Sequence, residues 1–137
     1  MATATSTTKT SLLRNNVNIQ PDTVRKTFKV TTIAAAGTTQ ATATAIGNEQ
    51  PFVLISNNTP TNGVILPTAT YIGQVITIYP QLVTDAPKVY PPVGGTINSG
   101  TANASVASTA RIAIEYVAVE AVSASGFTGL NWVTIGL

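Results

Sequence analysis

The chain has 137 residues, of which 44% are hydrophobic and 9% are charged, and its formal net charge is +2. A typical soluble domain carries about 25% charged residues, so the surface of this protein is unusually poor in charge. The length suits one domain with a real core. Because a weakly charged surface does little to repel other copies, the composition favours a protein that assembles. A secreted, threonine-rich β domain is the alternative.

The residue types that carry most enzyme chemistry are missing. The sequence contains no histidine and no cysteine, which excludes disulfide bonds, Ser-His-Asp and Cys-His sites, and the usual zinc and copper sites. The five carboxylates are too scattered to predict a calcium loop or an acid–base pair. No glycine-rich phosphate-binding motif is present. We therefore expect no enzymatic activity, no cofactor and no metal.

Residues 1–26 are predicted to form an extended arm, because they show no sustained period of 2 or 3.6. Cations gather in and just after this segment: Arg14, Arg25, Lys26 and Lys29. We expect these side chains to steer the arm to an acidic protein surface. A terminus without a role is the alternative. Nucleic acid is not expected as a partner, because aromatic residues are not interleaved with the cations beyond Phe28.

The start of the chain carries no targeting signal that we recognise. Residues 1–10 lack the apolar core of a signal peptide. No run of residues approaches the roughly 18 apolar residues of a membrane span. We therefore expect a protein that is made and kept in the cytoplasm, without a membrane partner, unless it leaves the cell by a route other than secretion.

Residues 27–137 are predicted to form an all-β body. Alternating patterns predict strands within 27–34 and 40–46, and the continuous apolar run at 52–56 predicts a strand buried on both faces. Turn-forming residues fill 57–63. Short strands follow within Val64–Leu66 and Val75–Tyr79.

The second half of the body begins irregularly and ends in two clear strands. The prolines at 80, 87, 91 and 92 exclude pairing in a central strand at those points, and Gly94–Gly95 predicts a turn. A strand is predicted at 111–122. The apolar residues alternate up to Tyr116 and then move to the other face at Val117, which indicates a bulge or burial on both faces. A helix is the alternative there, disfavoured by the β-branched residues. A final strand is predicted at 131–137.

About seven or eight short, regularly spaced strands predict an antiparallel β-sandwich or jelly-roll domain. Aromatic residues in such a body are expected to serve packing. The aromatic residues assigned to packing are Phe52, Tyr79, Tyr90, Tyr116 and Trp132.

One series of short motifs resembles a known group of proteins. The series comprises Gly63, Val64, Leu66, Pro67 and Ala69; then Gly73, Val75, Ile76 and Ile78; then Val89–Pro91; then Gly95–Asn98; and Trp132 in a late strand. It resembles small β domains of tailed-bacteriophage virion proteins, which include capsid cement or decoration proteins, head fibres and tail-fibre knobs. The likeness covers about residues 45–135 and does not reach the arm.

The resemblance implies a homotrimer without catalytic residues. A cement protein of this kind would bind the phage major capsid protein on the outer surface of the virion, after assembly in the cytoplasm of the bacterial host. The packing aromatics would then also serve the trimer, and the arm cations would bind the capsid. The alternative is a head-fibre or tail-fibre knob that binds a host glycan through exposed aromatics, such as Tyr71, Tyr90 or Trp132. A depolymerase fragment is a third reading, which would need two facing carboxylates in one cleft.

Overall fold

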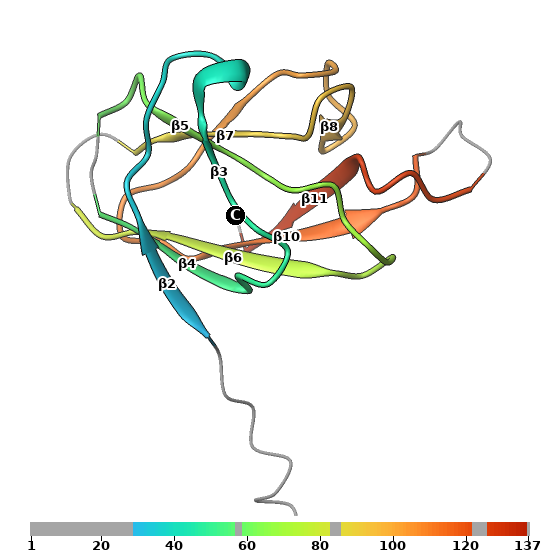
Figure 1. Cartoon of the computed structure of the whole chain (residues 1–137), viewed down its shortest axis with the longest axis horizontal. Helices are drawn as coiled ribbons and strands as arrows, with labels where there is room; N and C mark the ends of the chain where they lie inside the picture. Colours follow the sequence, from blue (N-terminus) through green and yellow to red (C-terminus); the bar gives the residue numbers. More distant parts are fainter. Residues whose placement is uncertain (1–28, 57–58, 83–85, 122–125, 137) are drawn as a thin grey trace, which may run out of the picture.

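The computed structural model describes residues 29–56, 59–82, 86–121 and 126–136, which form two stacked β-sheets (Figure 1). The six-stranded sheet has, in spatial order, β2 (Val30–Ile33), β4 (Phe52–Ile55), β6 (Val75–Pro80), β10 (Ile114–Val119), β11 (Asn131–Ile135) and β8 (Thr96–Ile97). The four-stranded sheet has β3 (Thr44–Ala45), β5 (Gly63–Ile65), β7 (Lys88–Tyr90) and β9 (Val106–Ala107). A short 3-10 helix, η2, spans Gln40–Thr42. The prediction of a mostly-β body is confirmed.

The prediction that the sheets are antiparallel is wrong for about half of the fold. From β2 to β9, consecutive strands alternate between the two sheets, and β2–β4, β4–β6, β3–β5, β5–β7 and β7–β9 each join a strand to the next one but one along the chain. The pairs β2–β4, β4–β6, β3–β5 and β5–β7 are parallel, as is β8–β11. Parallel neighbours need a crossover connection, and here a strand of the opposite sheet provides each one. The pairs β6–β10, β10–β11 and β7–β9 are antiparallel.

The hydrophobic core lies between the two sheets. The six-stranded sheet contributes Val53, Ile76 and Ile114, among others, and the four-stranded sheet contributes Val64 and Val89. These side chains are almost fully buried because strand side chains alternate between the two faces of a sheet. The described members of the core lie between Ile33 and Trp132.

Three local predictions are corrected by the structure. Residues 40–46 form η2 and the two-residue strand β3 instead of one strand, because the Thr39 and Thr42 side chains bond to local backbone and to each other. In β4, only Val53 and Ile55 are fully buried. In β10, pairing with β11 is continuous from Glu115 to Val119 without a bulge, so both apolar phases lie on a regular strand.

The loop before β11 depends on a glycine. Gly129 has φ +76°, and a Cβ there would overlap the carbonyl oxygen of Ala69. The same two residues are joined by a hydrogen bond of 2.9 Å from the Ala69 N–H to the Gly129 carbonyl. This close backbone approach fixes the β10–β11 connection against the loop that precedes β6.

We expect Gly129→Ala to lower the free energy of unfolding by about 2–4 kcal/mol, because it adds a steric clash to an unfavourable φ. Gly126→Ala is the matched control. Gly126 also has a positive φ, of +94°, but a Cβ there would meet no atom within 4 Å. The control should lose about 1 kcal/mol. Urea denaturation of the two variants measures the difference, and equal losses would contradict the close approach.

Candidate interaction surface

The face of the six-stranded sheet that points away from the four-stranded sheet is mostly apolar, and we call it the outer face. Burial patterns and strand register place its residues. They are Val30, Thr32, Phe52, Leu54, Val75, Thr77, Tyr79, Thr96, Glu115, Val117, Val119, Asn131, Val133 and Ile135. Glu115 is the charged residue among them. A strand with one face in the core and the other in solvent normally alternates apolar and polar side chains, so this outer face has the composition of a contact surface.

Several outer-face side chains remain exposed in the described chain. Val30 is 54% exposed, Ile135 is 53% exposed and Val75 is 39% exposed. Glu115 is also exposed. Scattered exposed valines would be ordinary, but these share one sheet face with half-buried apolar neighbours.

The corresponding face of the four-stranded sheet is covered around Tyr90 by its own chain. Tyr90 lies there, is 7% exposed, and donates a 3.0 Å hydrogen bond from its hydroxyl to the Thr38 carbonyl. The side chain of Gln40, in η2, donates a 2.7 Å bond to the Pro91 carbonyl. A Cβ on Gly63 would lie 2.6 Å from the Tyr90 ring, so glycine at that position makes room for the tyrosine. The two sheets thus differ in how far other segments of the chain cover their outward faces.

A groove of about 630 Å³ opens on the outer face. Its lining includes Phe52, Tyr71, Val75, Thr77 and Glu115. Tyr71 comes from the loop before β6 and is 61% exposed. The groove therefore combines aromatic and aliphatic walls with a single carboxylate, which suits binding of an apolar segment that carries a cation, or of a sugar ring.

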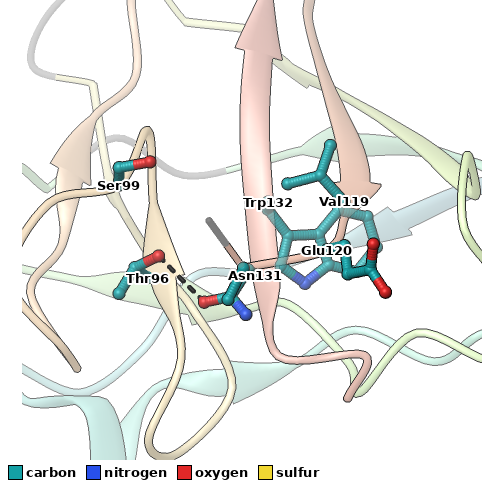
Figure 2. Close-up of a pocket in the computed structure, with 7 residues that line it drawn as sticks. Thr96, Ser99, Val119, Glu120, Asn131 and Trp132 are labelled. Carbon is teal, nitrogen blue, oxygen red and sulfur yellow. Dashed lines mark hydrogen bonds between the residues drawn. The ribbon is translucent and has the colours of Figure 1, made fainter. Parts of the chain in front are cut away.

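A smaller pocket of about 190 Å³ lies where β10, β11 and β8 meet. Figure 2 shows the Thr96 hydroxyl bonded to the Asn131 side chain at 3.0 Å, with the Trp132 indole and the Glu120 carboxylate beside them. Each of the two pockets described here is lined by one carboxylate, Glu115 in the groove and Glu120 in this pocket. Neither brings together the pair of carboxylates that glycoside hydrolysis uses.

The residues predicted for packing divide between the inside and the outer face. Tyr116 and Trp132 are fully buried between the sheets, and Tyr90 is buried under the segment that carries Thr38. Phe52 and Tyr79 are half-buried on the outer face. The part of these residues in a trimer stays a prediction.

The residues predicted for the arm lie mostly outside the described structure. Arg14, Arg25 and Lys26 belong to residues 1–28, which are not described, and Lys29 is exposed directly before β2. Capsid binding by these cations stays a prediction. The sequence reasoning missed Glu115, Val75 and Ile135 as surface candidates. The apolar residues on both faces of β4 and β10 were the signal that could have found them.

Two buried polar atoms have no hydrogen-bond partner among the described residues, the Tyr116 hydroxyl and the Trp132 Nε1. Both side chains point between the sheets, on neighbouring strands. Burial raises the pKa of Tyr116 well above its ordinary value of 10, because the phenolate would lose its hydration. An unpartnered buried hydroxyl also lowers the free energy of unfolding while the tyrosine is neutral.

We expect Tyr116→Phe to raise the free energy of unfolding by about 1 kcal/mol at neutral pH. Since burial holds the folded pKa of Tyr116 above the unfolded value of about 10, this group gives the free energy of unfolding no pH dependence well below pH 10 and lowers it as the pH rises above 10. Wild type should therefore lose up to about 1.4 kcal/mol per pH unit there from this group. The variant should lack that component in urea denaturation at pH 7 to 11. A variant less stable than wild type at pH 7 would show that the hydroxyl has a partner.

The chain matches no protein-family model, and comparisons with curated proteins and with solved structures find no match. The likeness of its motifs to phage virion proteins therefore stays a prediction. Within the described ranges, no helix has the length and apolar character needed to cross a membrane. The same part of the chain contains no cluster of three or more His, Cys, Asp or Glu residues that could hold a metal ion.

Proposed function

We propose that this protein is a virion structural protein, a decoration or cement protein that binds the outer surface of a phage capsid shell as a homotrimer and stabilises it. The observation that carries the proposal is the outer face, which is mostly apolar and poor in charge. Such a surface suits a protein whose exposed face is covered by other subunits after assembly. The virion is the proposed location, reached by assembly in the host cytoplasm.

The basic arm gives this protein a way to reach the shell. Residues 1–30 carry Lys9, Arg14, Arg25, Lys26 and Lys29 against Asp22, whereas the rest of the chain is slightly acidic. The segment joins the body at β2, which is the edge strand of the six-stranded sheet. Cations near an apolar face favour rapid, oriented association with an acidic capsid surface. The major capsid protein is the proposed partner.

The number of copies per particle tests the proposal. Purified particles of the virus that encodes the chain are analysed by quantitative mass spectrometry against the major capsid protein. A decoration protein should be present in hundreds of copies, because it follows the capsid lattice. A few to some tens of copies would indicate a fibre, and absence from the particle would overturn a virion role.

A fibre knob that binds a host glycan is the second candidate, and the groove is the observation in its favour. Tyr71 is exposed beside Phe52 and Glu115, and an aromatic ring with a nearby carboxylate can stack on a sugar and accept its hydroxyl bonds. Tyr90 and Trp132, the other aromatics predicted for this role, are buried. Glycan-array binding that Tyr71→Ala abolishes would favour this function over decoration.

A further inference from the structure

The outer face carries exposed apolar side chains on both sides of a central polar pair, Thr77 and Glu115. Val30, Val75 and Ile135 are exposed on it, and they are joined by half-buried apolar residues such as Val117 and Val133. Large apolar patches on soluble proteins mark interaction sites. The four-stranded sheet of the same molecule has its outward face covered around Tyr90 by the segment that carries Thr38.

The dimensions of the outer face match those of a subunit interface. Six strands spaced about 4.8 Å apart span about 24 Å, and the six-residue strands β6 and β10 are about 20 Å long. A stable interface buries about 800 Å² of accessible surface on each partner. A face of this size, with its rim, is large enough to form the core of such an interface.

The charges favour a head-to-tail contact over a contact of the face with itself. Glu115 lies on β10, inside the sheet, and lines the groove. A two-fold packing centred on the groove would bring two Glu115 carboxylates into one apolar contact, which is unfavourable. A head-to-tail contact, which closes into a ring when the rotation permits, can instead place a cation of the next copy against Glu115.

The edge of the sheet supplies a suitable cation and a suitable shape. Lys29 precedes β2, the edge strand, and is exposed beside Val30. The N-terminal end of β2 projects beyond the body (Figure 1). The groove is a hollow of about 630 Å³ with apolar walls and a carboxylate. A projecting end with one valine and one lysine matches the groove in apolar character and in charge.

We infer that the outer face is a head-to-tail interface between copies of this chain, in which Lys29 and Val30 of one copy contact the Glu115 groove of the next. The inference rests on the proposed function for the existence of an assembly, and it assigns the surface that builds it. The groove is then occupied by protein, which leaves no room for a glycan.

The first test is the oligomeric state of the full chain, measured by sedimentation equilibrium without capsids. We expect wild type to assemble and Val75→Asp to raise the dissociation constant by about a hundredfold or more, because an unpaired charge would be buried. Val93→Asp is the matched control, since Val93 is 72% exposed outside the outer face, and it should assemble as wild type does. Circular dichroism confirms that each variant is folded.

The second test addresses the orientation. Glu115→Lys and Lys29→Glu should each weaken assembly, and the double variant should recover most of the loss. Failure of the double variant to recover, with both single variants weakened, would overturn the head-to-tail pairing. A monomeric wild type, or unchanged assembly of Val75→Asp, would overturn the interface itself. A wild type that is monomeric until residues 1–26 are removed would also overturn the interface in the full chain, because the arm and not a second copy would then cover the face.

The outcome of these tests is independent of capsid binding. An intact oligomer that does not bind shells would contradict the proposed decoration function and leave the interface standing. A monomer that binds shells would contradict the interface and the homotrimer, and would leave shell binding standing.

Discussion

A variant that lacks residues 1–26 is expected to fold normally and to lose binding to capsid shells. The described core lies between Ile33 and Trp132, so the deletion removes none of it. It removes Arg14, Arg25 and Lys26 and leaves Lys29 in place. Cosedimentation with purified shells measures binding, and the loss should be at least about a hundredfold if the arm supplies most of the contact.

A full-length variant with Arg14, Arg25 and Lys26 changed to glutamine separates charge from chain length. If the cations steer association, this variant should bind more slowly than wild type at low salt, and the difference should shrink at high salt. The body should keep its unfolding midpoint in both variants. Unchanged shell binding by the deletion variant would refute the role of the arm.

Replacing Trp132 by alanine is expected to cause the largest loss of stability of any single change proposed here, about 3–5 kcal/mol. Trp132 is fully buried on β11, opposite Ala118 of β10 and beside Ile97 of β8 in the sheet register. A cavity left there would lie in the core between the sheets. A loss of this size would unfold much of a marginally stable domain at 37 °C.

Tyr71→Ala is the matched control for that change, because Tyr71 is a large aromatic that is mostly exposed. Its free energy of unfolding should change by less than about 0.5 kcal/mol. Thermal and urea unfolding of both variants checks the comparison. A small effect of Trp132→Ala would contradict the buried position of the indole and restore Trp132 as a candidate surface aromatic.

Hydrophobic patterning predicted the existence and place of the main strands, because alternation reports directly on burial. The strands predicted at 52–56, 111–122 and 131–137 appear as β4, β10 and β11. The pattern failed at 40–46, where local threonine hydrogen bonds form a 3-10 turn. Alternation of small residues cannot distinguish a strand from such a turn.

The pairing of strands could not be predicted from the sequence, because periodicity records which face a side chain occupies and not which strand lies beside it. The pairing of Phe52 with Val30 on one side and with Thr77 on the other leaves no local signal. The candidate surface could be predicted from the sequence only in part. Apolar residues in both phases of β10 indicated two contact faces, and the structure places one of them, with Val117 and Val119, on the outer face.

The alternation of consecutive strands between the two sheets has a consequence for how this chain folds. Among the described strands from β2 to β9, no two consecutive strands pair with each other, so these strands offer no local hairpin as an independent nucleus. Each parallel pair closes a loop that already contains a strand of the opposite sheet, and such non-local contacts slow folding. The hairpin of β10 and β11 is the local exception. Folding is therefore expected to begin near the carboxyl-terminal end with β10 and β11, and β6 then pairs with β10. The earlier strands follow alternately in the two sheets, so that both sheets grow together.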